Sequence, residues 1–297
     1  MINGQVPGPL IEANWGDWIE VTIHNEIPDE GASVHWHGFL QKGTQTYDGL
    51  PGIEQCPIAP GTSLTYRFQA SLYGSTWYHS HYSSQYASGL VGPITVYGPK
   101  NVPYDVDVGP VMLSDWYHQY YQTGVDMALA PLPYTAPPII NNVLINGKNN
   151  YDCSQTNLTC MPNAGLANFN FTSGKAHRLR LINPSGAATM KFSIDDHVMT
   201  VMANDFVEIH PYQTQVVTLG VGQRTDVIVY ANASSTGAFW MRAFAPPNCW
   251  PVDEPNNYAQ AAIYYENANR TALPTSQAVT AWDNTNCGNV RPSLYIH

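Results

Sequence analysis

The sequence has few charged side chains, and lysine and arginine are scarce in particular. Of its 297 residues, 11% are charged, only 12 are lysine or arginine, and these form no cluster. A nucleic-acid binder needs a basic patch to meet the phosphates, so that class of partner is excluded. No apolar run is long enough to span a bilayer, and no signal peptide is visible, since the sequence opens directly on a turn predicted at Met1–Gly4.

Residues typical of strands and turns are abundant instead. The chain is 44% hydrophobic and contains 23 prolines, 23 glycines and 19 tyrosines. Turn residues recur between short runs rich in valine, isoleucine, threonine and tyrosine, which predicts an all-β fold of the sandwich or barrel type. Turn residues also gather at Gly98–Pro99 and Pro103–Asp105. We therefore expect a first domain over residues 1–103, a second over 104–265 and a polar linker over 266–297.

The five cysteines predict two disulfides and one unpaired thiol. Cys153 and Cys160 flank a polar turn, while Cys249 and Cys287 flank a stretch rich in proline and asparagine. No histidine lies beside either pair, so both pairs fit disulfides better than a metal site. Cys56 is left without an obvious partner in this chain, which points to a partner outside it.

Four Asn-x-Ser/Thr sequons and an acidic net charge of −10 suit a secreted glycoprotein. Together with the two predicted disulfides, they predict an extracellular location. The candidate glycosylation sites are Asn157, Asn170, Asn232 and Asn269.

Two short stretches, His35–Gly38 and Trp77–His81, each contain a His-x-His motif within a run typical of a strand. Side chains at i and i+2 of a strand project from one face, so each motif presents two imidazoles side by side. If the two strands are neighbours, four imidazoles converge, and neutral imidazole is a preferred ligand of copper, zinc and iron. A single motif is often only a half-buried structural pair, but two in one chain favour a metal site. The candidate ligands are His35, His37, His79 and His81. Four other histidines stand alone and are expected to be structural or solvent-facing rather than ligands: His118, His177, His197 and His210.

The surroundings of both motifs resemble the first two copper motifs of multicopper oxidases, in particular those of the fungal laccase branch. The runs that carry the resemblance are HWHGFLQKGT, YDG and QCPIAPG around the first motif, and GSTWYHSH and QYASGLVG around the second. The resemblance covers nearly the whole chain and implies two cupredoxin-like Greek-key domains. It also implies that the N-terminal strand of the first domain and an entire third cupredoxin domain are missing from this chain.

The resemblance further implies a role for each candidate ligand in a trinuclear copper cluster. His35 would bind the type 2 copper, His37 and His79 one type 3 copper, and His81 the other. A full-length chain of the family holds four copper ions, and this chain would supply half of the trinuclear site, with the remaining ligands in the third domain. Asp48 matches an acidic residue near the type 2 copper that orients water and supplies protons, although Asp-Gly is also a common turn.

The implied activity is that of a laccase-like oxidase, which takes electrons one at a time from diphenols or related aromatics and reduces dioxygen to water. The third-domain ligands do not occur in this sequence, so this chain alone is expected to be inactive. Laccases usually carry an acidic residue just before the strand that matches Leu166–Phe171, but this sequence has Gly165 at that position. An enzyme of phenolic secondary metabolism is therefore as plausible as a general laccase. Two alternatives remain open: a non-catalytic copper-binding β-sandwich protein, and a zinc or iron enzyme of the cupin type.

Overall fold

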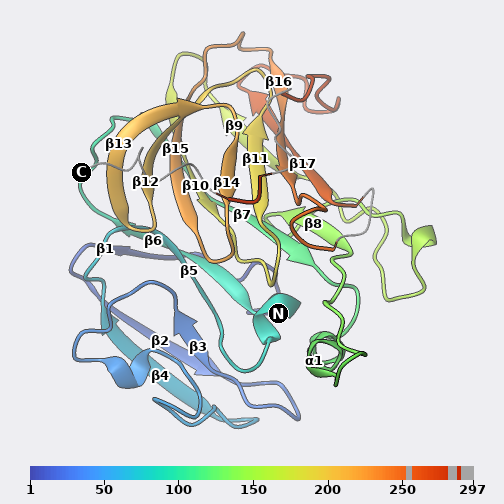
Figure 1. Ribbon diagram of the computed structural model, residues 1–297. Coiled ribbons are helices and arrows are strands. Elements are labelled where there is room, and N and C mark those ends of the chain that lie inside the picture. The colour runs from blue at the N-terminus through green and yellow to red at the C-terminus, as the bar shows by residue number, and fades with distance from the viewer. Residues whose placement is uncertain (252–255, 280–285, 289–297) are drawn as a thin grey trace. The chain divides into compact units, whose positions relative to one another are not determined.

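The computed structural model describes residues 1–251, 256–279 and 286–288 of the chain. Part of the stretch predicted as a linker, residues 280–285 and 289–297, lies outside the described residues. Regular structure in the described part is almost entirely strand, which confirms the predicted all-β fold (Figure 1). The helices found there are too short to cross a membrane.

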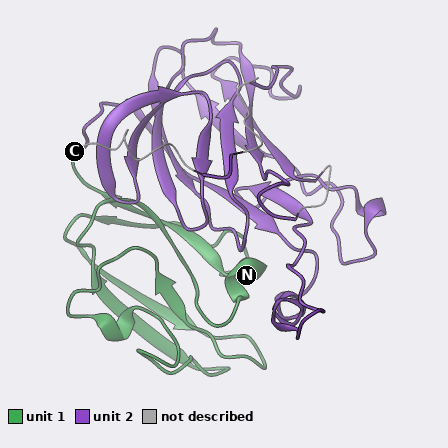
Figure 2. Ribbon diagram, in the orientation of Figure 1, with its two compact units in different colours: residues 1–99 green, residues 100–297 purple. Residues whose placement is uncertain are grey.

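The chain divides into two compact units, Met1–Pro99 (unit 1) and Lys100–His297 (unit 2), shown in Figure 2. Unit 1 contains a four-stranded sheet in the order β1-β6-β5-β3 and a two-stranded sheet, β2-β4. The pair β1–β6 is parallel, and the other pairs are antiparallel. The elements of unit 1 are β1 (Ile11–Asn14), β2 (Trp18–His24), β3 (Val34–Trp36), the 3-10 turn η1 (Gln45–Tyr47), β4 (Ser63–Gln69), β5 (Gly74–Ser80), the 3-10 turn η2 (Gln85–Ser88) and β6 (Val91–Tyr97).

An aromatic core joins the two sheets of unit 1. Trp36 of β3 is fully buried, and its ring lies 5.3 Å from that of Tyr66 and 5.0 Å from that of Phe68, both on β4. Burying a side chain of this size contributes about 3 kcal/mol to stability. Alternate residues of a strand face opposite sides, so anchoring Trp36 in the core turns its neighbours His35 and His37 toward the other face.

Unit 2 contains two larger sheets within the described residues. One has the order β13-β12-β15-β10-β7-β8, and the other has the order β14-β11-β16-β17-β9. The pairs β7–β10 and β9–β17 are parallel. The elements of unit 2 are β7 (Val106–Trp116), α1 (Tyr121–Leu129), β8 (Asn142–Ile145), the 3-10 turn η3 (Cys153–Gln155), β9 (Ala167–Phe171), β10 (Ala176–Ile182), β11 (Met190–Ile194), β12 (Met199–Asn204), β13 (Val207–Thr214), β14 (Val217–Leu219), β15 (Arg224–Tyr230), β16 (Ala238–Phe244) and β17 (Tyr258–Tyr265).

Strand β10 shows how sequence alternation builds unit 2. Leu179 belongs to the buried core cluster between the sheets, which also contains Phe171 of β9. On the opposite face of the strand, Arg180 pairs with Asp107 of β7, with Nη2 and Oδ2 2.6 Å apart. A buried guanidinium needs such a partner, because an unpaired buried charge is strongly destabilising.

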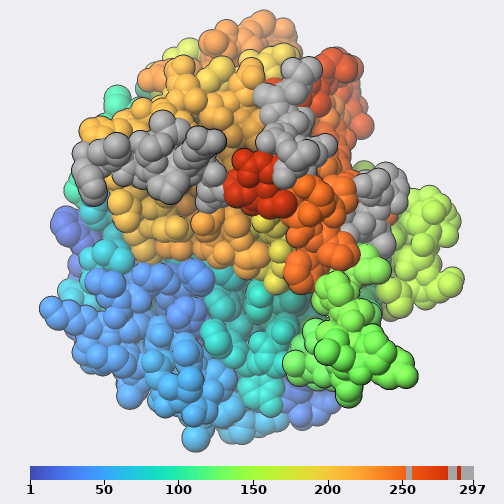
Figure 3. All heavy atoms as spheres, viewed as in Figure 1, coloured from blue at the N-terminus to red at the C-terminus, as the bar shows by residue number. Residues whose placement is uncertain are grey.

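The helix α1 is an addition to the predicted all-β architecture. Its first turn has no side-chain cap and Gly124 lies in its middle, so the sequence carries only weak local signals for a helix. The segment around α1 lies on the surface, green in Figure 3, and the side chains of Leu129, Leu132 and Tyr134 are exposed.

Residues 266–279, which belong to the predicted linker, are held against the five-stranded sheet. The Ser276 hydroxyl donates to Oδ2 of Asp195 at 2.8 Å and accepts from the backbone N–H of Trp240 at 2.9 Å. Arg242 donates from Nη2 to the carbonyl of Ser276 at 3.2 Å. This part of the segment therefore packs on unit 2, and a linker beyond it stays a prediction.

Two disulfides close loops of unit 2, as the cysteine spacing predicts. Cys153 pairs with Cys160 and Cys249 with Cys287, with Cα–Cα distances of 5.7 and 5.6 Å. Cys56 in unit 1 is exposed and unpaired. Disulfides of this kind persist in oxidising surroundings.

Candidate metal centre

The pairing of β3 with β5 places the two His-x-His motifs side by side. The strands run antiparallel, and His35 lies directly opposite His79. Beyond the end of β3, the backbone N–H of His37 donates to the carbonyl of Trp77 at 3.1 Å, which extends the pairing. Register between strands therefore brings histidines of two distant motifs onto one face.

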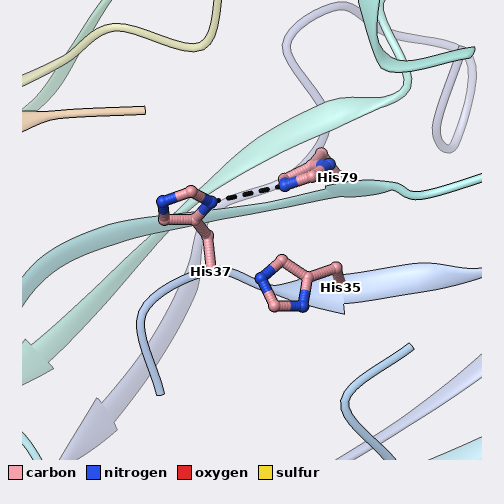
Figure 4. Close-up of side chains that lie close together, drawn as sticks. All are labelled: His35, His37 and His79. Atoms are coloured by element: carbon pink, nitrogen blue, oxygen red, sulfur yellow. Dashed lines mark hydrogen bonds between the residues drawn. The ribbon is translucent and has the colours of Figure 1, made fainter. Parts of the chain in front are cut away.

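Three of the four candidate ligands form a compact group (Figure 4). His35, His37 and His79 each present a ring nitrogen, and these nitrogens lie within 4.8 Å of one another. The exposed ring of His81 lies at the rim, with its centroid 5.6 Å from that of His35 and 5.8 Å from that of His79. All four rings thus share one site, with His81 outside the tightest group.

Backbone carbonyls select the tautomer of two of these histidines. Nδ1 of His35 lies 2.7 Å from the carbonyl oxygen of Asp48, and Nδ1 of His79 lies 2.9 Å from that of Ser80. A carbonyl oxygen only accepts, so each Nδ1 carries the proton and each Nε2 keeps its lone pair. Such an outer contact is the usual way in which a protein orients a metal-binding imidazole.

Asp48 lies beside His35, where the family resemblance implies it should lie, but its backbone makes the shorter contact. Its carboxylate Oδ1 is 3.2 Å from Nδ1 of His35, whereas the carbonyl oxygen is 2.7 Å away and receives the proton. Oδ1 is buried and has no hydrogen-bond partner. The next residue, Gly49, has φ +92°, and a Cβ there would lie only 2.0 Å from the carbonyl oxygen of Val34. Only glycine allows the loop to approach β3 this closely.

The electrostatics of the site favour neutral histidine. Burial, with a smaller contribution from the nearby rings of His35 and His81 and against the hydrogen bond to Ser80, lowers the pKa of His79 from its usual 6.5 to about 3. His79 is 7% exposed. Its Nε2 therefore offers a lone pair across the whole physiological pH range.

Trp77 belongs to the site although the sequence analysis assigns it no role. Its buried ring stacks on His79 at a centroid distance of 4.2 Å and on His37 at 4.8 Å. Trp77 stands two residues before His79 and so shares its face of β5. The i, i+2 spacing of Trp77 and His79 could have indicated this contact from the sequence. The sequence could not show that His37 packs against the same ring.

Two of the isolated histidines, His177 and His197 of unit 2, have structural roles. Nδ1 of His197 lies 2.7 Å from the carbonyl oxygen of Asp195, and Nε2 lies 2.7 Å from the hydroxyl of Tyr265. Nδ1 of His177 lies 3.1 Å from the carbonyl oxygen of Lys175, and the backbone N–H of Thr172 donates to its Nε2 at 3.0 Å. Both rings use both nitrogens in hydrogen bonds and offer no lone pair to a ligand.

The donor set fits copper or another late transition metal. All donors are imidazole nitrogens, which suit copper, zinc and iron. His37 Nδ1 and His79 Nε2 are 3.4 Å apart, a long hydrogen bond drawn dashed in Figure 4, and an ion bound between the two nitrogens would replace it. Two nitrogens at this separation can bind one ion, since metal–nitrogen bonds of about 2.0–2.1 Å span at most about 4.2 Å. The geometry alone does not choose among the three metals.

Comparisons with known proteins restrict that choice. Family models described as multicopper oxidase match residues 1–101 and 107–268. Laccase-2 of Botryotinia fuckeliana is 46% identical over 279 residues, which are 94% of this chain and 47% of that protein. The crystal structure of the laccase from Botrytis aclada superposes with a TM-score of 0.87 at 42% identity, covering 98% of this chain and 52% of that one. Fet3p, a multicopper oxidase that functions in iron import, gives a TM-score of 0.82 at 28% identity, covering 95% of this chain and 51% of that one. The chain thus spans about half the length of these relatives.

Proposed function

Because the chain belongs to the multicopper oxidase family, we propose that its histidine group is one half of a trinuclear copper site in a laccase-like oxidase. The observation that carries the proposal is the convergence of His35, His37 and His79, with a backbone carbonyl behind the first and the last. A merely structural histidine cluster has no need of lone pairs directed toward one another. In this reading both units are cupredoxin domains.

We assign each histidine the role that the family resemblance implies. His35 would hold the type 2 copper through Nε2, because its Nδ1 is occupied by the carbonyl of Asp48. His37 and His79 would share one type 3 copper, which their 3.4 Å contact supports. His81 would hold the second type 3 copper. In the full oxidase the remaining ligands would come from a third domain.

When bound, copper would supply the one-electron transfers and the four-electron reduction of dioxygen to water. The chain's own residues keep the ligands ordered. Burial keeps His79 neutral, so its Nε2 does not have to lose a proton before it binds metal. The buried, unpartnered Oδ1 of Asp48 is placed to hold a proton or orient a water beside His35.

The proposed reducing substrates are diphenols or related aromatics. Support comes from relatives named laccase and from the likeness of the sequence motifs. Glycine stands at position 165, where laccases usually carry an acidic residue before β9. We therefore place this protein with laccase-like enzymes of phenolic metabolism or with general laccases, and secretion is part of the same proposal because the chain carries two disulfides.

Copper binding tests the proposal on this chain, residues 1–297. The chain is stripped of copper and titrated with Cu(II), and binding is followed by electron paramagnetic resonance. We expect His37→Ala to weaken copper binding by at least about tenfold, since second-shell changes alone cost 10–100-fold. The control is His24→Ala, which removes an exposed histidine of β2 in the same unit.

Turnover tests the activity. The copper-loaded full-length oxidase, with its third domain, is given a diphenol, and oxygen uptake is compared with the amount of quinone formed. This chain alone is expected to consume no oxygen. The expected ratio is one dioxygen consumed for two diphenols oxidised, with no hydrogen peroxide. Equal copper binding by His37→Ala and the control, or peroxide as the main product, would refute the assignment.

A further inference from the structure

Three of the four sequons lie at one end of unit 2, although they are far apart in the sequence. Asn170 lies near the end of β9, Asn232 follows β15, and Asn269 follows β17. All three asparagines are exposed. β9 and β17 are parallel neighbours, so their last residues meet at the same end of the sheet, in the upper part of Figure 1.

Hydrogen bonds join the three segments directly. The Ser173 hydroxyl donates to the carbonyl of Ala233 at 3.3 Å, which ties the turn after β9 to the turn that carries Asn232. The backbone N–H of Asn267 donates to the carbonyl of Ser235 at 2.8 Å, which ties that turn to the end of β17. The three sequons therefore belong to one fixed surface.

The side-chain contacts of two of these asparagines leave the amide nitrogen unused. Nη2 of Arg270 donates to Oδ1 of Asn170 at 2.7 Å. The backbone N–H and the hydroxyl of Thr271 donate to Oδ1 of Asn269 at 3.0 and 2.8 Å. Both contacts use the oxygen, whereas an N-linked sugar is attached to Nδ2. A glycan at either position is compatible with the contacts of the folded chain.

Strand β9 of this surface could pair with another molecule if it is left uncovered. It is an end strand of its sheet within the described residues, with β17 as its neighbour. Its sequence, ANFNF, contains no charge and no proline, and its pairing has no bulge. Charge, proline and bulges are the usual devices that stop an edge strand from pairing with another molecule. Asn168 and Asn170 are its outward-facing residues.

We infer that Asn170, Asn232 and Asn269 carry N-linked glycans that together cover this end of unit 2 and shield the β9 edge. In each transfer the amide nitrogen Nδ2 forms a bond to the anomeric carbon of an oligosaccharide. The bond from that carbon to the diphosphate of a polyprenyl carrier breaks, and the amide loses one proton. The inference does not depend on the copper proposal.

Site mapping tests the occupancy. The intact protein is secreted from a eukaryotic host, and its peptides are treated with peptide N-glycosidase in ¹⁸O-water, which converts each glycosylated asparagine into labelled aspartate. We expect the label at all three positions. An unlabelled Asn170, Asn232 or Asn269 in the secreted protein overturns the three-glycan cover.

Self-association tests the shielding. Thr172→Ala abolishes the sequon of Asn170 but keeps its contact with Arg270, and Asn168→Gln changes the other outward residue of β9 without touching a sequon. Sedimentation velocity is run on both secreted variants at equal concentration. We expect dimers and larger species to increase severalfold in Thr172→Ala and to stay at the level of the unmodified sequence in Asn168→Gln. Equal association in the two variants overturns the shielding.

Discussion

Replacing Gly49 by alanine should damage both the stability of unit 1 and the metal site. The new Cβ would lie 2.0 Å from the carbonyl oxygen of Val34 and 2.8 Å from the backbone nitrogen of His35. Ordinary carbon contacts begin near 3.5 Å, so about an ångström or more of backbone movement is required. The obstacle is the backbone of β3, which cannot rotate away as a flexible side chain could.

Two physical effects set the expected magnitude. A residue with a Cβ at φ +92° costs about 1–2 kcal/mol. The overpacking adds about 1–3 kcal/mol. The sum, about 2–5 kcal/mol, is a large fraction of the 5–15 kcal/mol typical of a folded domain.

Gly52 provides a matched control three residues along the same loop. Its φ is +81°, close to that of Gly49, but a Cβ there would have nothing within 4 Å. Gly52→Ala therefore suffers only the conformational cost, about 1–2 kcal/mol. The difference between the two variants isolates the close approach to β3.

Urea denaturation measures the stability of both variants, and copper titration measures the site. Gly49→Ala should lower the free energy of unfolding by about 1–3 kcal/mol more than Gly52→Ala, which is the overpacking alone. It should also weaken copper binding by about 10–100-fold, because it displaces the carbonyl that orients His35. Equal unfolding free energies and equal copper affinities in the two variants would show that the loop does not position the histidine.

Three further predictions concern single contacts. Removing the disulfide Cys249–Cys287 should destabilise the protein by about 4 kcal/mol, and removing Cys153–Cys160 by about 2 kcal/mol, because the two disulfides close loops of 38 and 7 residues. Thermal unfolding of the two double Cys→Ser variants checks that the first loses more stability than the second. Burial lowers the pKa of His197 in the folded protein. Below about pH 6.5 the unfolded chain therefore binds a proton that the folded ring does not bind, and the free energy of unfolding decreases as the pH falls. His197→Gln should flatten that slope by up to about 1.4 kcal/mol per pH unit. Trp77→Leu should weaken copper binding by about two- to tenfold through the lost stacking and Trp77→Phe by less, as read from copper titrations.

The sequence predicts the local part of the site well. Alternation along a strand places His35 and His37 on one face and Trp36 on the other, and the structure has Trp36 in the core of unit 1. The same rule predicts the strand that becomes β5. Spacing could not predict that His35 lies opposite His79, because the register of two strands depends on turns and packing elsewhere in the chain. The family likeness implied only that the four histidines meet at one copper site.

The contacts that decide the chemistry of the histidines could not be predicted from residue types. The family resemblance pointed to the carboxylate of Asp48 as a group beside the copper site, but the atom that fixes the tautomer of His35 is the carbonyl oxygen of the same residue. Ser80 acts on His79 in the same way, also through its backbone. Every residue has a carbonyl, so no side-chain motif marks these positions.

What the sequence does mark is the residue that makes such a contact possible. Gly49 is required because the loop approaches β3 too closely for any Cβ. That approach delivers the carbonyl of Asp48 to Nδ1 of His35, and the proton held there leaves Nε2 as the lone pair. A change of one methyl group, at a residue that is not a proposed ligand, therefore acts on metal binding through the backbone. The carboxylate of Asp48 is therefore not needed to orient His35. Its Oδ1, which has no hydrogen-bond partner, is available for the proton chemistry proposed above.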